Sequence, residues 1–338
     1  MEWEELLAEF RALGGVAENV RLGYGTFGRG VFPIDPSKPA TLHASPNILV
    51  PADEVEVRDG NLMLKPLATI GARERAFFET LHANFGWGAG LFDEMRQAQQ
   101  AWSELPPDVV GYIANMGGTR NPEMRFIEPS SDHCFYHFIK SRDFLYDSNL
   151  YLAPLIDLVN HSSLVPTYVL ESGIGVHGTF PDEMLVRYNL VDSWAYALVY
   201  GFAEPAPQAY SLGITVGIFG RNQLVIDRDV GEIDIRAGIR YPTLHIEGDV
   251  LHVSHLLLGN LQTPDLPRAQ FRQLVAQYLN LKQADDVFDS IAHFNRQKFI
   301  GALRVLRNYD GPLIRMLEDA ATDQLEALSA CIGARSLE

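Results

Sequence analysis

The order of its local patterns most limits what this chain can fold into. Short β-like runs fill the first part of the sequence and return from Leu150 to about Val253. The stretch between them, from about Gly71 to Leu145, is helical in pattern, and so is everything after Pro264. A parallel α/β fold needs strands and helices that alternate. The sequence therefore predicts an α+β fold whose two β-rich parts meet across a helical insert.

Turn and helix signals support this division. Apolar residues recur at helical spacing from Trp3 to Leu13, and Gly14-Gly15 ends that pattern. Asp59-Gly60 joins two strand-like runs into a predicted hairpin, and Gly248-Asp249 does the same in "LHIEGDVLHV". Further short strands are predicted in "YSLGITVGIF", "NQLVID" and "IDIRAGIRY". Pro312 predicts the start of the last helix, because proline is favoured at the first helical position.

Four consecutive segments follow from these patterns. The first and third carry the β structure, the second is the helical insert and the fourth is a helical tail. Their expected bounds are 1–62, 63–145, 146–258 and 259–336.

Charge and cysteine content exclude several classes of protein. The chain of 338 residues has 43 acidic and 27 basic residues and a formal net charge of −16, without the basic stripe of a nucleic-acid binder. An acidic surface would suit a lysine-rich protein partner. The alternative interpretation is that the charge only keeps the protein soluble. Two cysteines, Cys134 and Cys331, are too few for a disulfide framework or a four-cysteine zinc site.

The hydropathy pattern contains no membrane signal. No apolar run reaches the roughly 18 residues of a membrane span. The start, "MEWEELLAEF", lacks the basic residues and apolar block of a secretory signal. We expect a soluble, cytoplasmic protein without a membrane or nucleic-acid partner.

Two short motifs in the first half of the chain could bind a ligand. In "GTFGRGVF", Gly28 and Gly30 allow close approach of a ligand to the backbone, but the motif lacks the third glycine of a dinucleotide fingerprint. Taken alone, the motif is more simply interpreted as a plain β-turn. In "SRDF", Arg142 could hold a carboxylate in a bidentate fork, or it is a surface residue at a helix C-terminus.

Polar and aromatic groups follow in the third segment. In "PLIDLVNHSS", Asn160 and His161 come directly after an apolar run, where a ligand site and a polar turn are both possible. Tyr188 and Tyr200 lie in "RYNLVDSWAYALVYGF" and could converge with that turn, although most such tyrosines are core residues.

Two established catalytic patterns find little support. His133 and His137 stand four residues apart on one predicted helix face, but no glutamate occupies the position that a zinc protease needs. No metal is therefore predicted, and a partly buried pair is the better interpretation. The G-x-S-x-G motif of serine hydrolases, which would carry a nucleophilic serine, does not occur.

The motifs become specific through their order. A glycine turn, a helical insert that ends in Ser-Arg, then "DLVNHSS" and then "YGFAEP" resemble the SET-domain methyltransferases of the Rubisco lysine methyltransferase type. The resemblance covers most of residues 15–215, and the tail from about residue 262 is similar to the helical substrate-binding domain of that group. It implies a SET-domain β-fold of short sheets with a helical insert and a C-terminal helical domain.

The same resemblance implies a cofactor, S-adenosylmethionine, and a role for each motif. The backbone of the glycine turn would contact the cofactor, Arg142 would hold its carboxylate, and Asn160 and His161 would bind its amino group and adenine. The implied turn residues are Phe27, Gly28, Arg29 and Gly30.

Catalysis and substrate binding are assigned in the same way. Tyr200 would be the catalytic tyrosine, and Tyr188 would assist it and line the substrate channel. Phe202 and Trp194 complete the expected substrate-binding set, with Trp194 expected to narrow or reshape the acceptor pocket. The expected acceptor is an amine, foremost a protein lysine.

One departure from the family pattern leaves the acceptor open. The group carries a Ser-Asn pair shortly before the catalytic tyrosine, whereas this chain has Ser193-Trp194. An enzyme acting on a small amine, an amino acid or the cofactor itself is the main alternative. A SET-like binding protein without turnover is a third reading, against which the intact Tyr200 and Asn160-His161 argue.

Overall fold

A computed structural model describes residues 2–116, 128–218, 222–228 and 241–333. The chain divides into two compact units, and each unit combines segments that are far apart in the sequence. Unit 1 comprises residues 1–100, 128–189 and 233–238, and unit 2 comprises residues 101–127, 190–232 and 239–338. Among the described residues, no helix combines the length and hydrophobicity that a bilayer crossing requires.

Unit 1 is built from small sheets of two or three short strands. The largest two have the orders β1-β4-β11 and β5-β9-β8, and β10 and β12 form a short parallel pair. The hairpins β2–β3 and β6–β7 complete the set. The strands are β1 (Val16–Glu18), β2 (Val20–Gly25), β3 (Gly28–Pro33), β4 (Ala40–Ala44), β5 (Val50–Pro51), β6 (Val55–Arg58), β7 (Asn61–Leu64), β8 (Phe144–Tyr146), β9 (Asn149–Leu152), β10 (Asn160–His161), β11 (Ile174–Gly178) and β12 (Leu185–Val186).

Helices pack beside these sheets because each has an apolar face. Leu6, Leu7 and Phe10 of the first helix are buried, and Phe10 contacts Phe77 of the second helix. The helices of this unit are α1 (Trp3–Ala12), α2 (Ala72–Phe85) and α5 (Ser131–Lys140), and α3 (Leu91–Ser103) continues into unit 2.

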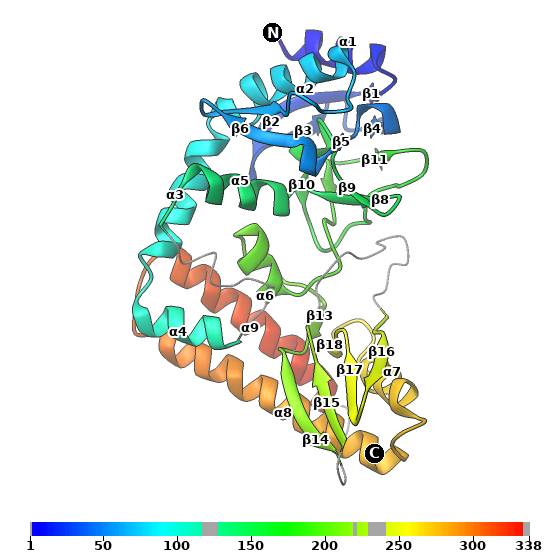
Figure 1. The fold of residues 1–338 in the computed structure, drawn as a ribbon, viewed down its shortest axis with the longest axis vertical. Coiled ribbons are helices and arrows are strands. Elements are labelled where there is room, and N and C mark those ends of the chain that lie inside the picture. Colours follow the sequence, from blue (N-terminus) through cyan, green and yellow to red (C-terminus); the bar gives the residue numbers. More distant parts are fainter. Residues whose placement is uncertain (1, 117–127, 219–221, 229–240, 334–338) are drawn as a thin grey trace. The chain divides into compact units, whose positions relative to one another are not determined.

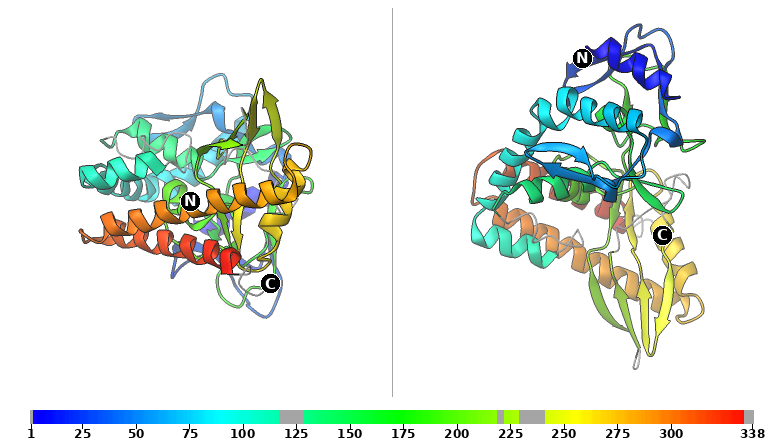
Figure 2. Two further views of the ribbon diagram at one scale, coloured as in Figure 1. Left: turned by 90° about the horizontal axis from the view of Figure 1, so that it is seen from below. Right: turned by 45° about the horizontal axis from the view of Figure 1, so that its top comes forward.

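Unit 2 combines one four-stranded sheet with a helical region. The sheet has the order β14-β15-β17-β16, and a separate pair joins β13 to β18. The two longest helices, α8 and α9, lie side by side (Figure 1; left view of Figure 2). The elements are α4 (Pro107–Met116), α6 (Ser193–Ala195), the π-turn η6 (Tyr196–Tyr200), β13 (Gln208–Tyr210), β14 (Ile214–Ile218), β15 (Asn222–Ile226), β16 (Leu244–Glu247), β17 (Val250–Val253), β18 (Leu257–Asn260), α7 (Leu266–Val275), α8 (Leu281–Leu306) and α9 (Pro312–Gly333).

The predicted α+β class is confirmed, with short sheets, helices in the insert and a helical C-terminal region. Both predicted hairpins form, and Asp59 and Gly60 have the positive φ that a tight hairpin turn requires. The insert contributes to both compact units, and strands from β13 to β18 share a core with the last helices. The division into four segments stays a prediction. Most of the predicted strand "IDIRAGIRY" lies outside the described residues.

Candidate functional site

The glycine motif of unit 1 forms the β2–β3 hairpin. Gly25 pairs with Gly28 and Gly23 pairs with Gly30, so Thr26 and Phe27 make the two-residue turn. Gly28 has a φ of 87°, which L-residues rarely adopt. The motif therefore is a β-turn, and whether its backbone also binds a cofactor stays a prediction.

At Gly30 the constraint is steric, because neighbouring side chains occupy the place where a Cβ atom would lie. A Cβ atom at this position would lie 2.7 Å from the Asn160 Nδ2 atom and would overlap the Glu183 carboxylate. The absent side chain lets both groups pack directly on the hairpin, so three segments far apart in the sequence meet here.

Replacing Gly30 with alanine should therefore lower the free energy of unfolding by about 1–3 kcal/mol through overpacking. Urea unfolding would measure the loss. Gly217→Ala is the matched control, because Gly217 is exposed on β14 and no described atom lies within 4 Å of the Cβ that the change adds. Equal stability of the two variants would contradict the close packing at Gly30.

Asn160 ties the hairpin to the rest of unit 1. It opens β10, where it pairs with Leu185 of β12. Its Nδ2 atom donates hydrogen bonds to the Arg29 carbonyl oxygen at 3.0 Å and to Glu183 Oε1 at 2.6 Å. Both partners are acceptors, so the orientation of the amide is determined by its hydrogen bonds. Figure 1 shows β10 and β3 in neighbouring positions.

His161 is turned into the protein. Its ring is 4% exposed, and Nδ1 accepts a hydrogen bond from the Tyr188 backbone N–H at 3.0 Å. Accepting at Nδ1 places the proton of the neutral ring on Nε2. Burial lowers the pKa of His161 to about 3, with a smaller contribution from the Arg187 charge. This imidazole stays uncharged at neutral pH and is held as a structural group.

Tyr188 is the partner of that imidazole. Its ring centroid lies 5.0 Å from that of His161, and its hydroxyl donates to the Val159 carbonyl oxygen at 2.8 Å. The backbone and the hydroxyl of Tyr188 thus both brace the Asn160-His161 turn. Its predicted part in catalysis and in the substrate channel stays a prediction.

Arg142 follows α5, a helix that Ser130 caps by accepting a hydrogen bond from the His133 backbone. The guanidinium lies 4.9 Å from the centre of the Phe138 ring, and Nη1 donates to Ser141 Oγ at 2.7 Å. Within the described residues, neither Arg142 nor Arg29 makes an ion pair with a carboxylate. Both arginines thus have charge available for an anionic ligand.

The charges of both arginines shift the pKa values of two buried groups, Asp157 and His82. Burial raises the pKa of Asp157 to about 6, while the positive charges of Arg142 and Arg29 lower it. Burial and then the same two charges lower the pKa of His82 to about 3. Asp157 Oδ1 and both His82 ring nitrogens have no hydrogen-bond partner among the described residues. The two arginines therefore act on one region of unit 1.

Sequence reasoning missed Asp157, His82 and Glu183. Asp157 stands three residues before Asn160 in the quoted motif, so its position alone could have drawn attention. Nothing local marks His82 or Glu183, because only burial and long-range contacts make them unusual.

The paired histidines of α5 have ordinary environments. His133 Nδ1 lies 3.0 Å from the Glu128 carbonyl oxygen, and His137 is buried next to Tyr136. The described residues contain no cluster of three or more groups suited to a metal ion.

The other predicted site residues belong to unit 2. Tyr200 ends the π-turn η6, whose Gly201 N–H donates to the Tyr196 carbonyl oxygen at 3.1 Å. Tyr200 and Phe202 lie 5.8 Å and 5.6 Å from Tyr196 between ring centres and form an aromatic cluster with it. Single π-turns of this kind occur frequently at functional sites.

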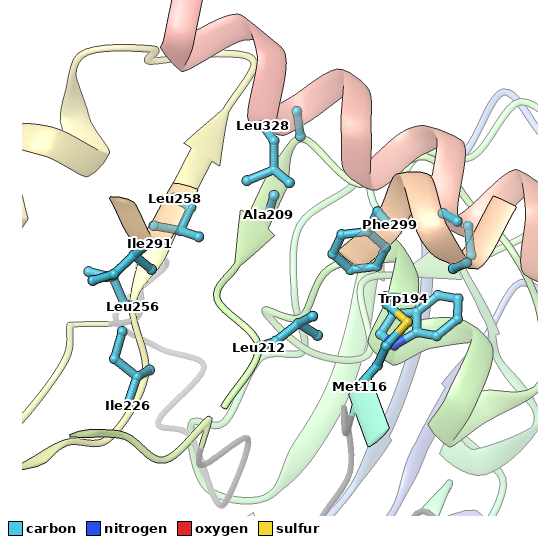
Figure 3. Close-up of a cluster of buried hydrophobic side chains, with 14 of the residues drawn as sticks. Met116, Trp194, Ala209, Leu212, Ile226, Leu256, Leu258, Ile291, Phe299 and Leu328 are labelled. Carbon is cyan, nitrogen blue, oxygen red and sulfur yellow. The ribbon is translucent and has the colours of Figure 1, made fainter. Parts of the chain in front are cut away.

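Trp194 occupies the core of unit 2. Its exposed fraction is 0%, and its ring meets Phe299 edge-on at 5.5 Å between centroids. Figure 3 shows the indole between Phe299 and Met116. A wholly buried indole packs against protein, and the predicted part of Trp194 in substrate binding stays a prediction.

Similarity to known proteins is limited at the level of sequence. No protein-family model matches. An uncharacterized protein of Aquifex aeolicus (strain VF5) is 29% identical over 101 residues, which is 30% of this chain and 83% of that protein.

Solved structures similar to this chain include the SET domain of LSMT bound to lysine and AdoHcy, at 13% identity and a TM-score of 0.44. That match covers 99% of this chain and 90% of the other. The same domain bound to MeLysine and AdoHcy matches at 13% identity and a TM-score of 0.43, over 99% and 91% of the two chains.

Proposed function

We propose that this chain is a SET-type methyltransferase that uses S-adenosylmethionine and transfers a methyl group to an amine. One observation carries the proposal. The hydrogen bond from Asn160 to the Arg29 carbonyl oxygen joins "NHSS" to "GRG" across 131 residues. These are the two motifs that the family resemblance assigns to the cofactor, and they meet in one place.

The groups around this contact suit the amino-acid part of the cofactor. Gly28 offers backbone atoms with no described atom within 4 Å of its Cβ position, and Arg142 offers a guanidinium without a carboxylate partner among the described residues. A planar guanidinium binds a carboxylate through two parallel hydrogen bonds. The main chain at Asn160 and His161 would contact the amino group and the adenine.

Methyl transfer depends mainly on the positioning of the acceptor amine relative to the methyl group. Bound S-adenosylmethionine supplies a methyl group that its sulfonium sulfur already activates. The residues of the chain therefore have to align an amine with that methyl and exclude water, and such alignment can account for a large part of a rate enhancement. A neutral, inward-facing His161 agrees with this, since the reaction needs no histidine base. An apolar channel would lower the pKa of the acceptor amine and so favour its nucleophilic form.

The acceptor that we favour is a protein lysine. A net charge of −16 favours encounter with a basic segment. Incubation with methyl-labelled cofactor tests the proposal, and we expect label in lysine side chains of a basic protein. Label in a small amine would reassign the acceptor, and absence of both transfer and cofactor binding would reject the proposal.

Tyr200 is the residue that we expect to act at the transferring methyl. Replacing Tyr200 with phenylalanine removes one hydroxyl and should lower kcat by about 100-fold, the scale of losing one transition-state hydrogen bond. Calorimetry should show nearly unchanged cofactor affinity. Tyr196→Phe is the matched control, since that buried neighbour has no assigned role. Equal rates for wild type and Tyr200→Phe would remove its catalytic role.

A further inference from the structure

Glu183 is a buried carboxylate beside the glycine hairpin. It precedes β12, and its exposed fraction is 7%. Oε1 accepts the hydrogen bond from Asn160, and Oε2 would lie 2.9 Å from a Cβ atom at Gly25. The carboxylate therefore lies against the hairpin where Gly25 and Gly30 leave room for it.

This carboxylate has no cation to balance it. Within the described residues, the side chain of Asn160 is its hydrogen-bond partner and no basic side chain pairs with it. Burial raises the pKa of Glu183, and the bond from Asn160 opposes that rise. An ionised carboxylate has room for about four hydrogen bonds. A buried charge with so few partners is costly, and a cationic ligand would offset that cost.

The nearby acceptors are arranged for a nitrogen with several protons. The Asn160 amide nitrogen already bridges the Arg29 carbonyl oxygen and Glu183 Oε1, at 3.0 Å and 2.6 Å. A primary ammonium also presents several N–H donors, and its positive charge would balance the negative charge of Glu183. The charges of Arg142 and Arg29 both act on Asp157, which stands three residues before Asn160. Unit 1 therefore has positive groups for the carboxylate of an amino acid as well as Glu183 for its ammonium.

We propose that Glu183, with the Arg29 carbonyl oxygen, binds the ammonium group of the amino-acid part of the cofactor. This deepens the proposed function and rests on it. Glu183 then sets a preference for ligands that carry a primary ammonium beside a carboxylate.

The test compares two probes by calorimetry, S-adenosylhomocysteine and its deaminated analogue. Wild type should prefer the amino form by about tenfold or more, the scale of a charge-assisted hydrogen bond. In Glu183→Gln the preference should fall to about twofold or less. Asp182→Asn is the matched control, because it removes the neighbouring exposed carboxylate and should keep the wild-type preference.

Glutamine keeps the shape and the acceptor for Asn160, so a purely bracing role for Glu183 would leave the preference intact. That result would overturn the inference while cofactor binding by wild type still supported the proposed function. Binding of neither probe to wild type would instead reject the proposed function.

A second measurement needs no variant. In mildly acidic buffer, binding of the ammonium-bearing probe should release protons, because a nearby cation favours the ionised form of Glu183. The deaminated probe should not do so. Calorimetry in buffers with different ionisation enthalpies measures this difference, and equal proton release by the two probes would contradict the inference.

Discussion

Replacing Asp192 with alanine will lower the free energy of unfolding by about 3–5 kcal/mol, because the change leaves a buried arginine without its counter-charge. Asp192 is 0% exposed and lies 3.1 Å from Arg228 Nη2. Its carboxylate also accepts hydrogen bonds from the Ala195 and Tyr210 backbone N–H groups and from Gln324 Nε2. The variant would lose all of these bonds together.

Asp192 also begins the helical segment that ends at Tyr200. The bond to Ala195 N is an N-cap of α6, and an N-cap contributes about 1 kcal/mol. The variant should therefore lose activity together with stability. Urea unfolding measures the loss, and Asp286→Ala on the exposed face of α8 is the matched control, expected within about 0.5 kcal/mol of wild type. A loss below about 1 kcal/mol for Asp192→Ala would contradict the energetic role of this network.

Replacing Arg142 with alanine will weaken binding of S-adenosylhomocysteine by about 100-fold, or about 2.8 kcal/mol, since truncating one partner of a close charge pair costs about 2–5 kcal/mol. The Arg142 guanidinium lies over the Phe138 ring and makes no ion pair with a described residue, so we expect it to bind the ligand carboxylate. Calorimetry measures the affinity. Removing the positive charge should also raise the pKa of His82, which Arg142 lowers, and NMR titration can follow this.

Lys140→Ala provides the control for Arg142→Ala. Lys140 lies two residues earlier, at the end of α5, and its exposed side chain pairs through Nζ with Asp143 at 3.0 Å. Loss of that cation should leave the affinity unchanged. If Arg142→Ala binds the ligand as tightly as Lys140→Ala does, Arg142 does not hold the carboxylate.

Local sequence patterns were sufficient for much of the fold. The Asp59-Gly60 and Gly248-Asp249 turns and the helix from Pro312 form as predicted, because turn geometry and helix termini depend on neighbouring residues. The division into units was not predictable in this way. It depends on contacts such as those between β18 and α9, which no local pattern encodes.

For the candidate site, the sequence by itself determined which groups are present: the glycine hairpin, Arg142, the Asn160-His161 pair and Tyr200. The tertiary structure decided what surrounds them. It buried Trp194 in a core, kept His161 neutral and brought Glu183 against Gly30. The reason is physical: the charge state of a side chain and its contacts depend on burial and on long-range neighbours, and both arise only when distant segments pack together.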